Sequence, residues 1–203
     1  MKTRTIAAVC VAVFGLAVAA FPQAESEKPR SEQYSAMAFL PAGAGMRMVG
    51  PGANTTLNIY IKRYSTDAEA QQLRQALLTG GQDAVTKILE KMSSIGKVSL
   101  TGRVGFFDLK FIRSRPTEAG RMIVAACDRP IQFLEAYHSG RSMDYSIGIM
   151  QMNLKQKGGG GGKEEGEGVL IYAAKIKVIE GNTVEIENYG VEPAKLMAVR
   201  KLK

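Results

Sequence analysis

The chain has 203 residues and a formal net charge of +8 at pH 7, from 27 Lys and Arg against 19 Asp and Glu. A chain of this length can bury enough apolar surface to be stable without disulfide bonds, and one His with two Cys is too few for the common zinc sites. The basic excess favours anionic partners such as lipopolysaccharide, phospholipid headgroups, cell-wall polymers or extracellular DNA, with ordinary solubility as the alternative explanation.

Residues 1–20 follow the pattern of a secretory signal peptide. Lys2 and Arg4 precede an uncharged, mostly apolar run from Ile6 to Ala20, and small residues allow cleavage between positions 19 and 24. The run is shorter than the roughly 20 apolar residues of a spanning helix, and Pro22 closes it. We therefore expect export to the periplasm or the extracellular space, with no transmembrane segment after cleavage; an uncleaved N-terminal anchor is the alternative.

Cleavage would remove Lys2, Arg4 and Cys10, which lowers the net charge from +8 by two, to +6, and leaves Cys127 as the only thiol. No disulfide bond could then form within the chain. Cys127 follows the apolar residues 122–126, so we expect its thiol to be buried.

Residues 21–55 are predicted to form a flexible arm rich in Gly, Pro, Ala and Met. Glycine and proline are dense at 41–45 and 50–52, and both break helices and strands. Residues 36–55 also carry more apolar side chains than a solvated linker needs. Part of the arm is therefore expected to pack on the domain or on another protein.

The domain is expected to span residues 56–203 and to begin with a strand over 57–64. Alternation places Leu57, Ile59 and Ile61 on its buried face. The wet face would then hold the intervening side chains, which are Asn58, Tyr60, Lys62 and Tyr64.

A helical hairpin is predicted next. Thr66-Asp67-Ala68-Glu69 has the spacing of a capping box, so a helix should begin there. Gly80-Gly81 would end this first helix, and a second helix would run to Met92 with an apolar stripe on one face. We expect both helices to pack on the sheet.

Strands dominate from Lys97 onward. Apolar residues occupy even positions up to Phe106 and odd positions from Phe107, so a bulge, a bend or a break in the strand is expected beside Gly105. A turn is predicted over 115–120, followed by the strand that ends at Cys127. Residues 130–139 are compatible with a short helix or an irregular segment.

Four further strands are predicted in the C-terminal third. Residues 145–154 should pair with 169–179 across a flexible Gly-rich loop at 157–167. A tight turn at 180–183 leads into a strand over 184–189, and the final strand covers 196–202. The expected fold is therefore α+β: an antiparallel β-meander or partial barrel of about six or seven strands with one helical hairpin packed on it.

Six short segments between residues 97 and 203 form a recognisable set: Asp128-Arg129-Pro130-Ile131, Met143-Asp144-Tyr145, Gly166-Glu167-Gly168, Ala173-Ala174-Lys175, Ile186-Glu187-Asn188-Tyr189-Gly190 and Val199-Arg200. Together they resemble uncharacterised exported proteins of environmental bacteria. No activity is attached to such proteins, so the resemblance implies export and no mechanism.

Side chains suited to catalysis are few. Cys127 and His138 could form a dyad oriented by Asp128, Glu135 or Asp144, but a thiol that ends an apolar run is inert. Paired carboxylates could come from Glu135 with Asp144 or from Glu185 with Glu187, although the second pair also fits the wet face of a strand. We therefore predict no catalytic, cofactor-binding or metal-binding residue.

The strongest positive feature is a basic hairpin with interleaved phenylalanines. Its basic residues are Arg103, Lys110, Arg113, Arg115 and Arg121. Arginine suits phosphate and carboxylate groups, and aromatic side chains between basic ones can stack on bases. The hairpin therefore indicates polyanion contact, with a solvated hairpin over a phenylalanine core as the alternative.

These observations favour an exported, non-enzymatic protein with a binding or structural role in the cell envelope or the extracellular space. Polyanion contact through the basic hairpin is its specific form, and export makes an intracellular nucleic acid an unsuitable partner. Two alternatives remain. One is an exported hydrolase with an unidentified site, and the other is a subunit of an envelope assembly docked through residues 36–55.

Overall fold

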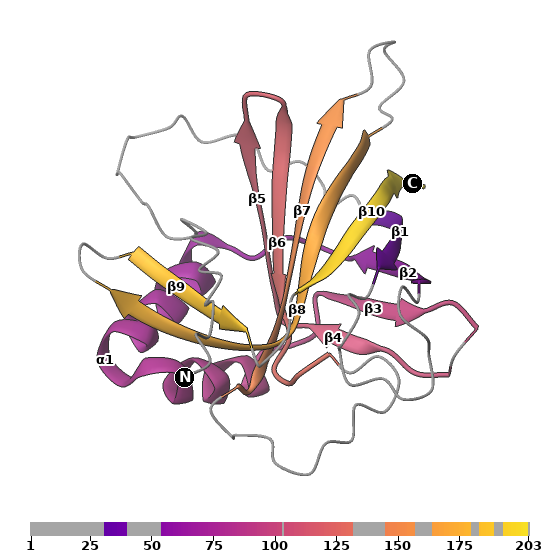
Figure 1. Cartoon of the computed structure of the whole chain (residues 1–203). Helices are drawn as coiled ribbons and strands as arrows, with labels where there is room; N and C mark the ends of the chain where they lie inside the picture. Colours follow the sequence, from indigo (N-terminus) through magenta and orange to yellow (C-terminus); the bar gives the residue numbers. More distant parts are fainter. Residues whose placement is uncertain are drawn as a thin grey trace, which may run out of the picture.

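A computed structural model describes residues 31–39, 54–102, 104–131, 145–156, 164–179, 183–188 and 193–202. Within these residues, antiparallel strands curl into a nearly closed barrel, and one long helix packs against its outer face (Figure 1). The elements are β1 Glu32–Phe39, β2 Asn54–Ile61, α1 Asp67–Lys91, β3 Gly96–Leu100, β4 Phe107–Leu109, β5 Phe111–Thr117, β6 Gly120–Ala126, β7 Ile147–Gln156, β8 Glu164–Ile179, β9 Thr183–Asn188 and β10 Ala194–Lys201.

The strands follow the order β4-β3-β2-β1-β10-β8-β7-β6-β5, and β9 adds to β8. The expected α+β fold is therefore wrong. The described residues form a ten-stranded sheet instead of six or seven strands, and they contain one helical element instead of a helical hairpin.

Strand β1 accounts for part of this difference, because it lies inside the predicted flexible arm. It pairs with β2 on one side and with β10 on the other. Its inward side chains include Tyr34, Ala36 and Ala38, all of which are buried. The domain thus begins well before residue 56. The predicted signal peptide and the rest of the arm, residues 21–30 and 40–53, lie outside the described residues.

Residues 97–117 account for another part of the difference between the expected and the observed fold. The predicted bulge, bend or break beside Gly105 is a hairpin that joins β3 to β4, with Val98 opposite Phe107. Gly105 has a φ of 107°, a conformation that favours glycine. The change of side-chain parity therefore marks a reversal of chain direction rather than a bulge.

The interior of the barrel is filled by apolar side chains. Strand β2 contributes Leu57, Ile59 and Ile61, each no more than 1% exposed, as the alternation in its sequence predicted. Cys127 is also fully buried, which confirms the expectation for its thiol. Burial raises the pKa of this thiol, and the nearby Asp128 carboxylate raises it further. The thiol is therefore held protonated and unreactive.

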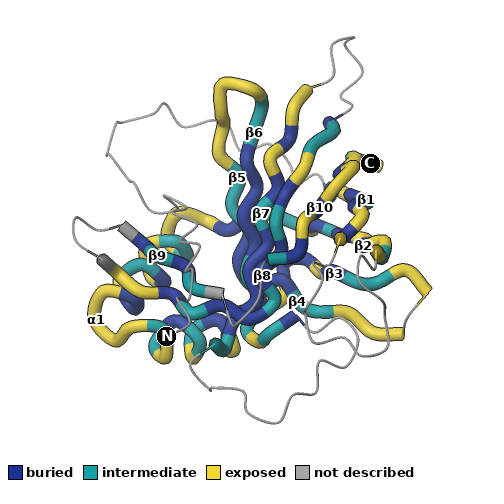
Figure 2. The backbone as a smooth tube through the Cα atoms, viewed as in Figure 1, coloured by how far each residue is buried: buried dark blue, intermediate teal, exposed yellow. Residues whose placement is uncertain are grey.

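A second apolar core lies outside the barrel, between α1 and the strands β5 to β9. The helix contributes Leu73, Leu77, Val85 and Leu89. The strands contribute Phe111, Met122, Val124, Ile147, Ile149, Ile171, Ala174, Ile176, Val184 and Ile186. Several central strands are consequently buried on both faces, as the dark blue tube in Figure 2 shows.

Helix α1 starts where the capping box predicted. The Thr66 side chain accepts a hydrogen bond from the Glu69 backbone N–H at 3.2 Å, and the Glu69 carboxylate accepts one from the Thr66 N–H at 2.8 Å. At Gly81 the backbone leaves the helical region, with φ 64° and ψ −160°. The two predicted helices are therefore the halves of one kinked element that lies on the outer face of the sheet (Figure 1).

Replacing Thr66 with Ala is expected to lower the free energy of unfolding by about 1 kcal/mol, because one helix N–H loses its capping acceptor. Urea denaturation measures the change. Thr66→Ser keeps the hydroxyl and should stay close to the parent protein. Equal losses in the Ala and Ser variants would contradict the capping role.

The C-terminal pairings agree with the sequence pattern. Strand β7 pairs with β8 from Ile147 opposite Ala174 to Gln156 opposite Glu164, and β8 turns back into β9. The predicted loop at 157–167 is shorter than expected, because residues 164–167 belong to β8, while 157–163 lie outside the described residues. Of the segment 130–139, only residues 130 and 131 are described.

Candidate functional site

Six polar side chains meet at one end of the barrel interior. This interior polar cluster consists of Glu32 and Tyr34 from β1, Tyr64 beyond the end of β2, Arg121 from β6, Glu164 from β8 and Lys201 from β10. Antiparallel pairing brings the starts of β1, β6 and β8 to the same end as the ends of β2 and β10. The cluster thus ties together five segments that are far apart in the sequence.

Arg121 is the centre of the cluster. Its Nε donates to Glu164 Oε1 at 2.7 Å and its Nη2 to Glu164 Oε2 at 2.6 Å, which is a bidentate pair. Nη2 also lies 2.9 Å from Glu32 Oε1 and 2.5 Å from Tyr34 Oη, and Nη1 donates to Tyr64 Oη at 3.0 Å. Each of the three guanidinium nitrogens therefore has at least one hydrogen-bond acceptor within the cluster.

Lys201 reaches the cluster because β10 is irregular. Its Nζ lies 2.8 Å from Glu32 Oε1 and 3.5 Å from Glu164 Oε2. Ala194 and Leu196 point inward at even positions, whereas Val199 and Lys201 do so at odd positions. The register shifts between these pairs, and Ala198 has a φ of 48°. This bulge turns Lys201 from the outer to the inner face.

The charges within the cluster balance each other. Burial by itself would raise the pKa of Glu32, but hydrogen bonds from Lys201, Tyr64 and Arg121 outweigh it and lower the pKa to about 2. The pKa of Glu164 is also lowered, because Arg121 outweighs the effect of burial. Burial and the neighbouring Glu32 carboxylate raise the pKa values of Tyr34 and Tyr64. Both carboxylates are thus ionised at neutral pH and both hydroxyls are neutral.

The structure does not gather the residues predicted for polyanion contact into one surface. Lys110 donates to the Met92 carbonyl at 3.0 Å, with its Nζ 3.5 Å from an Asp128 carboxylate oxygen. Arg113 pairs with Asp67 at 2.8 Å and donates to the Ser65 carbonyl at 3.0 Å.

Arg121 lies in the interior polar cluster, and Arg115 is exposed near the end of β5 with its Nη2 3.9 Å from Met122 Sδ. Arg103 lies outside the described residues. Lys110, Arg113 and Arg121 therefore bridge parts of the fold instead of presenting a common face.

Sequence reasoning missed the cluster, although one signal for it was present. Arg121 has the parity of Ile123, Ala125 and Cys127, all of which are buried, so alternation placed it on the inner face. Tyr64 was assigned to the wet face of a strand, and this was wrong. The strand ends at Ile61, and the Tyr64 hydroxyl donates to Glu32 inside the barrel.

The structure describes some of the side chains that were considered for catalysis. Glu187 accepts from Lys177 Nζ at 2.9 Å and from Tyr145 Oη at 2.7 Å, and its pKa is lowered by these bonds. His138, Glu135 and Asp144 lie outside the described residues. No group of three or more His, Cys, Asp or Glu side chains that could hold a metal ion occurs among the described residues.

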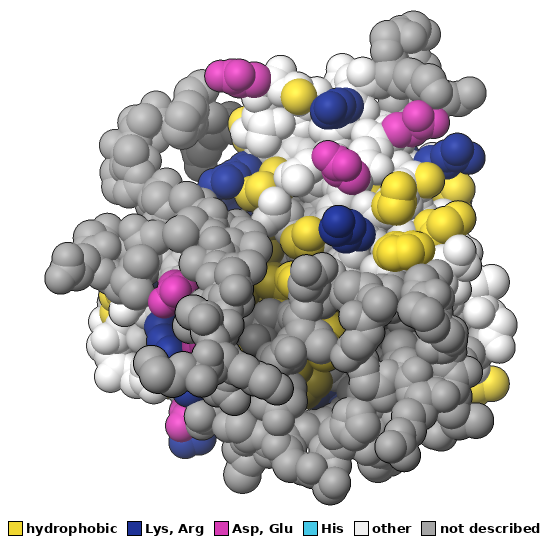
Figure 3. Space-filling model, viewed as in Figure 1, with side chains coloured by type: hydrophobic (Ala, Val, Ile, Leu, Met, Phe, Trp, Pro, Cys, Tyr) yellow, Lys and Arg dark blue, Asp and Glu magenta, His cyan; other side chains and the backbone are white. Residues whose placement is uncertain are grey.

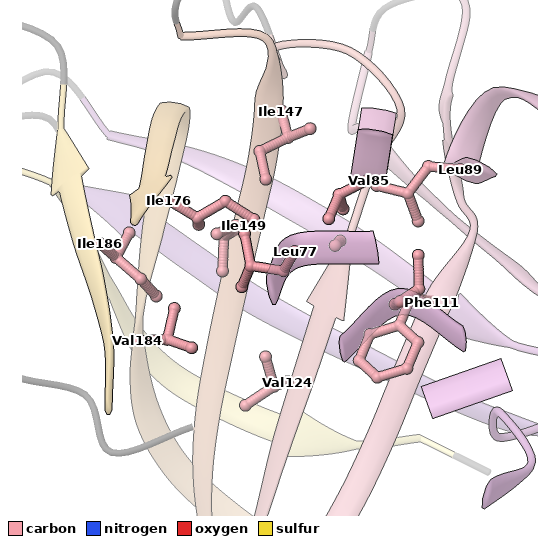
Figure 4. A pocket seen from close by; sticks show the side chains of 12 residues that line it. Leu77, Val85, Leu89, Phe111, Val124, Ile147, Ile149, Ile176, Val184 and Ile186 are labelled. Atoms are coloured by element: carbon pink, nitrogen blue, oxygen red, sulfur yellow. The ribbon is translucent and has the colours of Figure 1, made fainter. Parts of the chain in front are cut away.

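An apolar cavity of about 60 Å³ lies between α1 and the outer face of the sheet (Figure 4). Its wall consists of Leu73, Leu77, Val85, Leu89, Phe111, Val124, Ala126, Ile147, Ile149, Ile176, Val184 and Ile186. Leu73 and Leu77 come from the part of α1 before the kink at Gly81, and Val85 and Leu89 come from the part after it.

The outer face of β1 and β10 also exposes large apolar side chains. Met37 lies opposite Met197 in the paired strands, and Phe39 follows on the same face. Their exposed fractions are 44%, 52% and 38%. Figure 3 shows hydrophobic side chains gathered over this side of the barrel among charged ones. Docking of an assembly through residues 36–55 remains a proposal, and residues 40–53 lie outside the described part.

No family model, no curated protein and no solved structure matches the chain. The resemblance to exported bacterial proteins therefore stays a prediction. In the described residues, no helix has both the length and the apolar character needed to cross a membrane.

Proposed function

We propose that this chain is an exported, non-enzymatic binding protein whose ligand places a small apolar group in the cavity beneath α1. The observation that carries the proposal is the wall of that cavity, where all twelve lining side chains are apolar. Export is supported by the signal-peptide pattern of residues 1–20. The interior polar cluster supports a structural rather than a catalytic use of the buried charges, because its members bond to one another.

The size and lining of the cavity define the ligand class. A water molecule needs about 10–15 Å³ by the same measure, so the cavity holds roughly four to six heavy atoms. The wall offers no hydrogen-bond partners, and a water molecule would be poorly held there. A short alkyl chain therefore fits, and a polar remainder of the ligand would stay outside the cavity.

The test uses xenon as a probe of the full chain. We expect saturable binding, measured by xenon NMR, together with a higher Tm under xenon pressure. Val184→Phe fills the cavity from β9 and should weaken xenon binding at least about tenfold, a change of about 1.4 kcal/mol. Val169→Phe, a change of equal size outside the wall, should leave binding unchanged. Absence of saturable binding by the parent protein would refute the proposal.

A further inference from the structure

Strand β8 extends beyond its neighbour β7. Strand β7 pairs with β8 only as far as Ile147 opposite Ala174, and at that same residue β9 joins through Asn188. Because Ala174 pairs with both strands, β7 and β9 lie on opposite edges of β8. From residue 175 onward, β8 has β9 on one edge and no strand on the other among the described residues (Figure 1).

A side chain from the helix takes the place of the missing strand at one position. Gln82 lies just after the kink in α1, and its Oε1 accepts a hydrogen bond from the Ile176 N–H at 2.6 Å. Its Nε2 donates to Ser146 Oγ, at the start of β7, at 2.9 Å. Gln82 thereby closes the end of the β7–β8 ladder.

The direction of the Ile176 N–H shows which other backbone groups face this edge. In an antiparallel strand, the N–H and C=O of one residue point to the same side, and successive residues alternate. The Ile176 C=O and both backbone groups of Val178 therefore point away from β9. No hydrogen bond within the described part of the chain engages these three groups.

A groove of about 520 Å³ runs along this free edge. Its walls are residues 175–178 of β8 and, from the kink of α1, Leu77, Leu78, Gly80, Gly81, Gln82 and Asp83. Leu78 and Val178 expose apolar surface beside this groove, with exposed fractions of 45% and 38%. The charged lining residues are Lys175, Lys177 and Asp83, and Lys177 pairs with Glu187 at 2.9 Å.

We propose that this groove binds an extended, apolar peptide segment of a partner protein, which adds as a strand to β8 at residues 176–178. The free backbone groups would supply main-chain hydrogen bonds, as in other cases of strand addition. Leu78 and Val178 contact an apolar side chain of the segment. This site is separate from the ligand of the apolar cavity, although Leu77 and Ile176 belong to both walls.

The test uses the full chain and a fluorescent probe peptide, acetyl-Val-Glu-Val-Glu-Val-amide, titrated to about 1 mM. Fluorescence polarisation should show saturable binding. Two matched peptides carry backbone N-methyl groups on one or the other set of alternating residues. A strand on one edge uses only one set of N–H groups, so one peptide should lose about tenfold in affinity and the other should not. Equal effects, or no binding of the probe, would overturn the proposal.

Two variants at Val178 test whether the probe peptide binds along β8. Val178→Pro removes the N–H that faces the groove and leaves the donors that face β9 in place. Its affinity for the probe peptide should fall about tenfold, whereas Val178→Ala keeps the N–H and should lose much less. Xenon binding should persist in both variants, which separates this site from the cavity. If Val178→Pro fails to fold, the N-methylated peptides still decide the question with the parent protein.

Discussion

Replacement of Arg121 with Met should lower the free energy of unfolding by about 3–5 kcal/mol at neutral pH. The Arg121 side chain is 21% exposed, and the two carboxylates that it contacts are about 10% exposed, at 11% for Glu32 and 10% for Glu164. Its loss leaves both carboxylates inside the barrel with Lys201 as the remaining cation of the cluster. Urea denaturation at pH 7 measures the effect.

Two further variants show whether the uncompensated charge causes the loss. Arg115→Met changes an exposed arginine on the adjacent strand and should stay within about 0.5 kcal/mol of the parent protein. Arg121→Met combined with Glu164→Leu leaves Glu32 paired with Lys201 and should recover much of the stability. A loss below about 1 kcal/mol in Arg121→Met would show that the cluster contributes little.

Acid should destabilise the protein through Glu32. Its pKa is about 2 in the folded protein, against the ordinary value of 4.5 for a Glu side chain. Because the folded pKa is the lower one, the stabilisation is fully present above pH 4.5 and is lost as the pH falls toward 2. The shift corresponds to about 3 kcal/mol, which urea denaturation at a series of pH values between 6 and 2 would reveal.

Glu32→Gln is the variant that isolates this contribution. It should be less stable than the parent protein at pH 6, and its stability should fall less between pH 5 and 2. Glu164, whose pKa is also lowered, accounts for part of the remaining acid sensitivity. The exposed Glu118 provides a control, since Glu118→Gln should follow the parent curve. Identical acid curves for Glu32→Gln and the parent protein would rule out the assigned role.

Elements with a complete local pattern could be predicted from the sequence. The alternation in β2 and the capping box at Thr66 each lie within a few residues, and each is present. Strand β1 lacked such a pattern, because its inward side chains include Ala36 and Ala38 and its flanks are rich in Gly and Pro. Its place in the barrel depends on pairing with β10, where Tyr34 lies opposite Lys201.

The interior polar cluster could be predicted only in part, for the same reason. Parity alone placed Arg121 on the inner face, but it could not identify partners at positions 32, 164 and 201. Lys201 was further hidden by the bulge at Ala198, which reverses the parity of β10. Contacts that join distant segments depend on strand order, which the sequence pattern does not contain.

The position of β1 between β2 and β10 has a consequence for how the molecule folds. Until residues 194–201 are available, both β1 and β8 have an open edge where β10 belongs, and Glu32 lacks its lysine partner. Such distant pairing makes folding slow and leaves intermediates open to aggregation. The pairings of β10 with β1 and with β8 therefore cannot form until the chain has been synthesised as far as residue 201.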